Sequence, residues 1–249
     1  MSTFADAAGL LEAIGVVDLR KTMPRGVGHW ATRIEADVLG ICTHHTGSTN
    51  QDPYKTAAYH TSPENHIRPG EGLPSICYQI FIDETGRASL TEDLASITWA
   101  QGKEDAISPG DENRHCISAA FAGDFESLGY TGHSKGPSDA AMGTWRSVVV
   151  CLAGIFKVSP RGMFGHKDFG KPTCPGTKLY GEILSNRPDR RDLKWWQLQL
   201  GVKVDGKWGP ITQQALDRKQ AELGMRRTRT RDVFTELTLE ALESKKSQG

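Results

Sequence analysis

Apolar residues recur at helical spacing in three segments of the chain. Leucine and alanine repeat in this way over residues 4–17, and residues 53–60 have the composition of a second, short helix. The longest segment opens on Ser138, a residue type suited to the N-cap position, and runs to about Phe156. Its apolar positions form one stripe that a helix would bury against a core: Trp145, Val148, Val149, Leu152, Ile155 and Phe156.

Shorter apolar runs between these helices predict β-strands. Residues 38–43 form a compact apolar run, typical of a strand buried on both faces. Residues 75–83 alternate, so that Tyr78, Ile80 and Ile82 would share one face of a strand. Strands interleaved with helices predict an α/β fold, in which helices flank a mixed central β-sheet. Three further short strands are expected, at residues 88–90, 97–99 and 116–121.

A change in composition near the C-terminus divides the chain. The segment SNRPDRRD, residues 185–192, is polar and charged, which is typical of a linker. We therefore predict a main domain over residues 1–184, a linker over residues 185–192 and a small helical domain over residues 193–249.

The charge balance narrows the choice of partners. Lys and Arg together number 30, as do Asp and Glu, so the formal net charge is zero and nucleic acid is not the expected partner. We read no apolar run approaching the roughly 20 residues that span a bilayer, and we expect no membrane insertion. The first 20 residues lack the features of a secretory signal, so we expect synthesis in the cytoplasm. We also expect the protein to be a monomer.

The cysteines and histidines supply the candidate chemistry. Five cysteines, an odd number in a chain without a signal peptide, argue against a disulfide framework. Cys174 stands apart from the other four because it follows a polar turn, eight residues after His166, in the stretch GHKDFGKPTCPG. The pair His44-His45 lies at the end of the apolar run over residues 38–43.

Two imidazoles and one thiolate are a usual ligand set for catalytic zinc, whose fourth position stays open for water. The residues alone leave other interpretations open. The histidines could cap a sheet edge, and Cys174 could be a small buried hydrophobe. Convergence of these distant segments is the physical requirement that the spacing by itself does not prove.

Five segments, in order along residues 16–180, resemble the zinc N-acetylmuramoyl-L-alanine amidases, the family of phage lysozyme-type amidases and animal peptidoglycan recognition proteins. The resemblance implies zinc-dependent hydrolysis of the amide that joins N-acetylmuramic acid to L-alanine in peptidoglycan. Each match is short, and their common order makes them specific together. The segments are VVDLRKTMP, GICTHHTGS, DPYKTAAYH with LPSICYQIFIDETG, NRHCISAAFAGDF and GHKDFGKPTCPG.

Carried over residue by residue, this resemblance assigns Zn²⁺ to His44, His166 and Cys174. It implies that His45 supports the site and does not bind the metal. Tyr78 falls at the position of the family's catalytic tyrosine, although a strand aromatic packed in the core is the alternative. A further residue, Asp168, could orient a ligand or lie in a solvated turn.

The chain also departs from the family pattern. The position two residues before the metal cysteine usually holds Lys or Thr, which helps to stabilise the oxyanion, and here it is Pro172. Proline has no donor, so Lys171 or Thr173 is the candidate replacement. Elsewhere, Gln79 replaces a histidine that often follows the tyrosine. Residues 100–101, Ala-Gln, lie where family members often have Trp-His-Ala.

Residues 193–224 resemble a small helical peptidoglycan-binding domain. The turn VDGKWGP matches its signature, and Thr212 is expected to open a helix. The alternative is a helical cap with Trp195, Trp196 and Trp208 as its core. Together the resemblances imply a lytic enzyme, most like a phage endolysin, that acts on the bacterial cell wall after release. A non-catalytic peptidoglycan recognition protein and a host wall-remodelling amidase are the alternatives.

Overall fold

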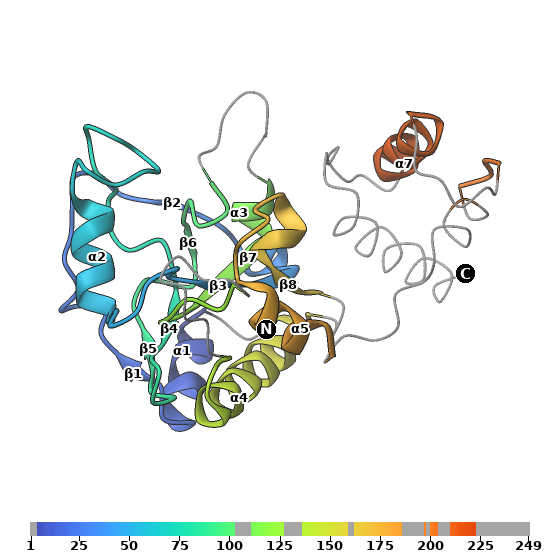
Figure 1. The fold of residues 1–249 in the computed structure, drawn as a ribbon. Helices are drawn as coiled ribbons and strands as arrows, with labels where there is room; N and C mark the ends of the chain where they lie inside the picture. Colours follow the sequence, from blue (N-terminus) through green and yellow to red (C-terminus); the bar gives the residue numbers. More distant parts are fainter. Residues whose placement is uncertain are drawn as a thin grey trace. The chain divides into compact units, whose positions relative to one another are not determined.

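The structure, a computed structural model, describes residues 4–102, 111–126, 136–158, 162–185, 197, 200–203 and 210–222 (Figure 1). The chain divides into two compact units, residues 1–186 and 187–249. Each unit is described by itself below. The first carries the sheet and all of the site residues predicted above.

Regular elements follow one another closely through the first unit. The helices are α1 (Phe4–Ala13), α2 (Pro53–Thr61), α3 (Asp111–His115), α4 (Asp139–Phe156) and α5 (Thr177–Ser185), with the 3-10 helices η1 (Glu35–Asp37) and η3 (His166–Phe169). The strands are β1 (Val17–Asp18), β2 (Ala31–Thr32), β3 (Gly40–His45), β4 (Ile80–Ile82), β5 (Ala88–Leu90), β6 (Ser96–Ile97), β7 (Cys116–Phe121) and β8 (Met163–Gly165).

Six of these strands form one mixed sheet in the order β1-β5-β4-β7-β3-β8. Its central members β4, β7, β3 and β8 run parallel, whereas β5 is antiparallel to β4. The strands β2 and β6 pair separately. The carboxyl ends of the parallel strands meet at one edge, which is where sites gather in such folds. This arrangement confirms the α/β fold with a mixed central sheet and flanking helices.

Side chains alternate between two buried faces of the sheet, because successive residues of a strand point to opposite sides. On β4, Ile80 and Ile82 belong to the larger core cluster, which α1 and α4 cover, whereas Phe81 belongs to a second cluster with Ala57 of α2. On β7, Ala120 joins this second cluster. The sheet is therefore covered on both faces, and both contain apolar side chains.

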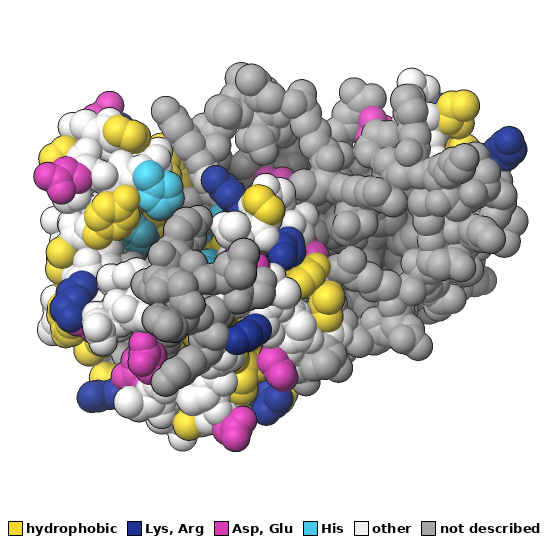
Figure 2. All heavy atoms as spheres, viewed as in Figure 1, with side chains coloured by type: hydrophobic (Ala, Val, Ile, Leu, Met, Phe, Trp, Pro, Cys, Tyr) yellow, Lys and Arg dark blue, Asp and Glu magenta, His cyan; other side chains and the backbone are white. Residues whose placement is uncertain are grey.

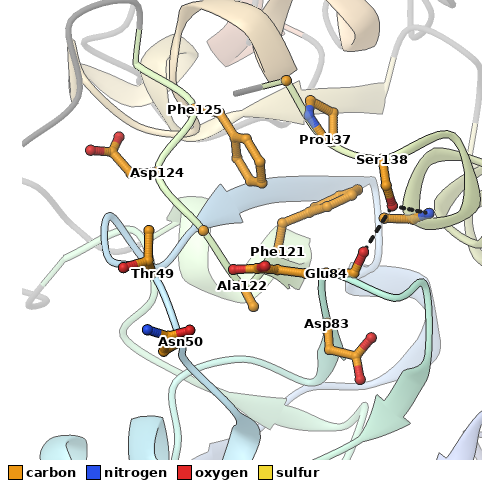
Figure 3. Close-up of a pocket in the computed structure, with 13 residues that line it drawn as sticks. Thr49, Asn50, Asp83, Glu84, Phe121, Ala122, Asp124, Phe125, Pro137 and Ser138 are labelled. Carbon is orange, nitrogen blue, oxygen red and sulfur yellow. Dashed lines mark hydrogen bonds between the residues drawn. The ribbon is translucent and has the colours of Figure 1, made fainter. Parts of the chain in front are cut away.

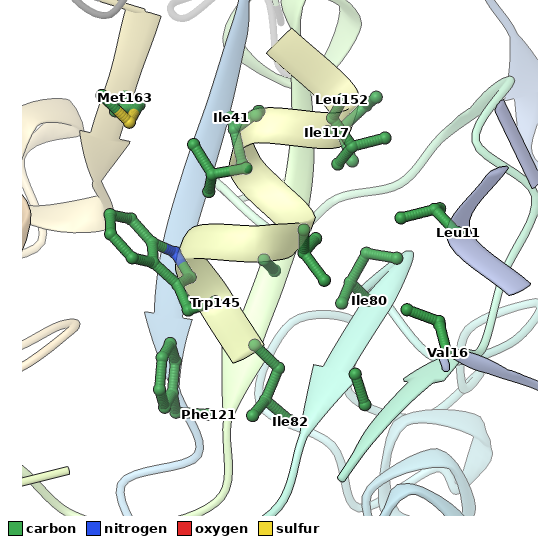
Figure 4. Close-up of a cluster of buried hydrophobic side chains, with 14 of the residues drawn as sticks. Leu11, Val16, Ile41, Ile80, Ile82, Ile117, Phe121, Trp145, Leu152 and Met163 are labelled. Atoms are coloured by element: carbon green, nitrogen blue, oxygen red, sulfur yellow. The ribbon is translucent and has the colours of Figure 1, made fainter. Parts of the chain in front are cut away.

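The helix α4 anchors the larger cluster. Figure 4 shows its Trp145 directed toward the sheet, between Met163 of β8 and Phe121 of β7. The indole Nε1 donates to Thr43 Oγ1 at 3.1 Å. By length and composition alone α4 could also cross a membrane, contrary to the sequence prediction. The core helix of a globular domain can be equally long and apolar, and α4 has the buried stripe of such a helix.

Several predicted elements are confirmed and others change. The strand at residues 116–121 and the helix N-cap at Ser138, whose side chain accepts the Ala141 N–H, are as predicted. The expected strand over residues 75–83 is reduced to Ile80–Ile82. Tyr78 lies outside it and packs with the second cluster, so the prediction that it shares a face with Ile80 and Ile82 is wrong.

Only part of the second unit is described. Its one described helix is α7 (Pro210–Glu222), which begins two residues before the predicted start at Thr212. A proline in the first helical position explains this start, because the missing N–H would be unpaired there in any case. The predicted linker beyond residue 185, residues 204–209 of the VDGKWGP turn and the three tryptophans lie outside the described residues.

Candidate metal centre

Strand register brings the two candidate imidazoles together. β3 and β8 are parallel neighbours in which Thr43 pairs with Gly165. The next residues are His44, near the end of β3, and His166, directly after β8, so both histidines lie at the same edge of the sheet. Their ring centroids lie 4.5 Å apart. Two segments separated by more than a hundred residues thus converge because their strands pair.

The loop after β8 delivers the third candidate ligand. Asp168 accepts the Gly165 N–H at 3.0 Å and the Tyr180 hydroxyl, so its buried carboxylate braces the turn and is not solvated. Gly165 has no room for a side chain, because a Cβ would lie 2.7 Å from Tyr180 and 2.8 Å from Pro175. This close packing holds the loop that carries Cys174 against the sheet.

His44, His166 and Cys174 offer ligand atoms that all lie within 4.8 Å of one another. The Cys174 Sγ is 3.7 Å from His44 Nδ1. Tetrahedral bonds of about 2.0–2.3 Å place neighbouring ligands about 3.5 Å apart, so the group fits a metal ion after small adjustments. The buried His166 Nε2 finds no hydrogen-bond partner in the described structure, as expected of an atom meant for a metal.

Burial sets the protonation of these three groups. Desolvation lowers the pKa of His166 to about 3, and it lowers the pKa of His44 well below its usual value, with the nearby His166 adding to the effect. Both imidazoles are therefore neutral at pH 7, with a lone pair free to coordinate. Burial also raises the pKa of the Cys174 thiol to about 12, although the His45 backbone N–H and Lys171 oppose it. A cation at the site would favour the thiolate.

Two of the candidate ligands, His166 and Cys174, line a cleft of 510 Å³ whose lining also includes Tyr78, Trp99, Lys171 and Thr173. Figure 2 shows histidine side chains around a hollow on this face of the first unit. The Tyr78 ring is 5.2 Å from the His44 ring and 5.4 Å from the His60 ring. Burial holds the pKa of its phenol well above 10, so at neutral pH Tyr78 remains a hydrogen-bond donor.

His45 is absent from the ligand group, and strand alternation explains why. On β3, Ile41 belongs to the larger core and Thr43 bonds to Trp145, so the odd positions face α4. His45 shares that parity, and its Nδ1 accepts the Phe125 N–H at 3.2 Å. His44 projects from the opposite face, toward Tyr78.

The turn before Cys174 shows which neighbours of Pro172 reach the cleft. Lys171 and Thr173 both line it. The Lys171 N–H donates to the His166 carbonyl at 3.3 Å, which fixes the start of the turn beside a candidate ligand. Lys171 also lowers the pKa values of His66 and Cys174, so its ammonium group acts electrostatically on the cleft.

Gln101 is a site residue that the sequence interpretation missed. Its Nε2 lies 3.3 Å from His44 Nε2 and 3.0 Å from Ser118 Oγ. The sequence gives only the unusual Ala-Gln at residues 100–101. No periodicity indicates that a loop amide would reach a strand histidine 57 residues earlier in the chain.

A second hollow, of 680 Å³, lies beside Phe121 and Phe125 (Figure 3). Its polar lining includes Asp83, Glu84 and Asp124, and the Ser138 hydroxyl donates to the Glu84 carbonyl at its rim. The lining includes no histidine or cysteine, and it shares no residue with the cleft described above. Of the two hollows, only the first cleft is lined by side chains of the candidate metal-binding group.

A family model, described as N-acetylmuramoyl-L-alanine amidase, matches residues 35–177, which are more than half of the chain and include every candidate ligand. The chain belongs to this amidase family. A search of curated proteins gives no match. The resemblance stated from the five sequence segments is therefore confirmed at the level of the family.

Solved structures of the same fold come from phage and animal proteins. The Ph2119 endolysin of a Thermus scotoductus bacteriophage has a TM-score of 0.51 at 19% identity, covering 70% of this chain and 99% of that one. Drosophila peptidoglycan recognition protein SD has a TM-score of 0.53 at 15% identity, and the match covers 70% of this chain and 98% of that one. Peptidoglycan recognition protein LE, solved with a monomeric diaminopimelic acid-type peptidoglycan, has a TM-score of 0.53 at 15% identity. The match covers 69% of this chain and 94% of that one. At these low identities the structural similarity shows a shared fold.

Proposed function

We propose that this chain is a zinc-dependent N-acetylmuramoyl-L-alanine amidase that hydrolyses peptidoglycan, as an endolysin does after its release to the cell wall. The observation that carries the proposal is the convergence of His44, His166 and Cys174, two of which, His166 and Cys174, line an open cleft. A recognition protein needs a groove for its ligand. It does not need a set of two imidazoles and a thiol beside a buried phenol.

The three side chains have complementary roles toward the metal. His44 through Nδ1, His166 through Nε2 and Cys174 through Sγ would hold Zn²⁺ and leave one position facing the cleft. Zinc would supply a nucleophile by lowering the pKa of its water to about 7, and it would polarise the scissile carbonyl. The neutral imidazoles lose no proton on binding, whereas the thiol must lose one.

Tyr78 and the turn before Cys174 would act on the substrate. Tyr78 keeps its phenolic proton at neutral pH and lines the cleft beside His44, so it can donate to the oxyanion that develops on the amide carbonyl. Lys171 would supply positive charge for the same oxyanion, and Thr173 would offer a hydroxyl. These two residues flank Pro172, which cannot donate a hydrogen bond. They would take over the role of the Lys or Thr that the family usually has at that position.

Product chemistry tests the proposed reaction. We expect the purified protein to release new amino groups from peptidoglycan without new reducing sugars, because an amide is cleaved and the glycosidic bonds are not. Removal of zinc by a chelator should stop amine release, and added Zn²⁺ should restore it. Binding to peptidoglycan without amine release would instead indicate a recognition protein, and new reducing ends would indicate a glycosidase.

We propose that residues 193–249 bind the cell wall. The resemblance of residues 193–224 to a peptidoglycan-binding domain supports this role, and residues 187–249 form a compact unit of their own that includes α7. A tethered wall-binding unit raises the effective concentration of substrate at the cleft. It would therefore increase activity on intact walls more than activity on soluble fragments.

Deletion of residues 187–249 is the corresponding test, because the boundary follows the division of the chain into its two units. We expect the truncated protein to sediment with purified cell walls at least about 10-fold less efficiently, in line with the gain that linked binding sites provide. Its zinc content and its activity on soluble muropeptides should match those of the full chain. Equal sedimentation of both proteins would assign the second unit a structural role.

A further inference from the structure

Gln101 contacts both candidate zinc histidines, although the reaction described above gives it no part. Its side-chain amide lies 3.3 Å from His44 Nε2. Its backbone also acts on the His166 ring, where it opposes the lowering of the His166 pKa by burial. One residue is thus placed to orient two rings that reach the site from different strands.

We propose that Gln101 is a positioning residue for zinc, whose amide oxygen accepts the Nε2 proton of His44 and thereby directs Nδ1 to the metal. This inference rests on the proposed zinc site. It gives a function to a residue that lies outside the ligand set and that departs from the family pattern at residues 100–101.

The tautomer of His44 determines which of its ring nitrogens needs a hydrogen-bond acceptor. His44 Nδ1 faces the Cys174 sulfur at 3.7 Å, so Nδ1 is the atom available for a metal. A neutral imidazole that coordinates through Nδ1 carries its proton on Nε2, and this proton needs an acceptor. Among metal-binding histidines such an acceptor is nearly always present, and it fixes both the tautomer and the ring orientation.

The side-chain amide of Gln101 can supply this acceptor. Its Oε1 is buried and has no hydrogen-bond partner among the described residues, whereas its Nε2 faces His44 Nε2 and the Ser118 hydroxyl. The two ends of an amide have nearly the same shape, and half a turn about the last side-chain bond exchanges them. Oε1 would then accept from both His44 Nε2–H and Ser118 Oγ–H, because a carbonyl oxygen has two lone pairs.

The backbone around Gln101 is held firmly enough for a positioning role. The Gln101 N–H donates to Asn113 Oδ1 at 3.0 Å, and Asn113 Nδ2 donates to the Gly102 carbonyl at 2.9 Å. Asn113 is itself buried, at 3% exposure. These two bonds tie the backbone at Gln101 and Gly102 to one buried side chain, so that the Gln101 side chain meets His44 from a defined direction.

Zinc affinity tests this role directly. Gln101→Met keeps the length of the side chain and removes the acceptor, and we expect it to bind Zn²⁺ about 10–100-fold more weakly in competition with a chelator. Gln101→Glu keeps an acceptor for the His44 proton and should bind zinc at least as tightly as the native protein. Thermal unfolding of the metal-free variants separates a loss of folding from a loss of affinity.

Nitrogen NMR of the zinc-loaded native protein gives a measurement that needs no variant. We expect His44 to show a protonated Nε2 and a metal-bound Nδ1. Equal zinc affinity of native protein and Gln101→Met, or metal at His44 Nε2, would overturn the role of Gln101 while leaving the zinc site intact. Failure of the native protein to bind zinc would instead refute the proposed function on which the inference rests.

Discussion

Replacing Cys174 with alanine is expected to abolish both bound zinc and amide hydrolysis. The variant retains His44 and His166 but loses the only anionic ligand of the group. Metal catalysis contributes several kcal/mol to such reactions, so we expect the rate of amine release to fall by at least about 10³-fold. Elemental analysis of the purified variant should show the zinc content falling from about one per chain toward zero.

Cys151→Ala is the matched control for this change. Cys151 is also a partly exposed free thiol, but it lies on α4 at the edge of the larger core and away from the cleft. Its replacement should leave zinc content and activity close to native values. Full activity of Cys174→Ala after treatment with a chelator would contradict the zinc mechanism altogether.

Replacing Tyr78 with phenylalanine is expected to slow hydrolysis while leaving the metal in place. The phenol lines the cleft, and its raised pKa keeps it a donor throughout the neutral range. Removal of one donor to a developing oxyanion typically costs about 10²–10³-fold in rate. The loss should appear in kcat on a soluble muropeptide, because this hydrogen bond strengthens in the transition state.

Tyr54→Phe provides the control for the lost hydroxyl. Tyr54 lies on α2, where its hydroxyl is 2.9 Å from Thr22 Oγ1, and it is not part of the cleft lining. This variant should keep native kcat. An unchanged kcat in Tyr78→Phe would assign Tyr78 to core packing, the alternative that its sequence position left open.

Sequence patterns were sufficient where an element is long or capped. The stripe from Trp145 to Phe156 and the cap at Ser138 predict α4 nearly to the residue, and the apolar run at residues 116–121 predicts β7. By contrast β8 has only three residues, Met163–Gly165, too few to establish a period. It was missed although it places His166, because its strand geometry comes from pairing with β3.

Alternation places His44 and His45 on opposite faces of the sheet but does not choose between them. With Ile41 in the larger core, period two places His45 on that face and His44 on the other. The chain alone does not say which face carries the cleft, since both faces are buried. Gln101 was beyond sequence reasoning for a related reason: its contact with His44 depends on a loop whose course is set by Asn113.

A crystal structure of the full chain with anomalous scattering recorded on both sides of the zinc edge tests the central claim most directly. We predict one zinc peak, about 2.0–2.1 Å from His44 Nδ1 and His166 Nε2 and about 2.3 Å from Cys174 Sγ. A solvent molecule should complete the coordination on the side of the cleft. Zinc bound at other residues, or no zinc peak in protein that hydrolyses peptidoglycan, would contradict the account.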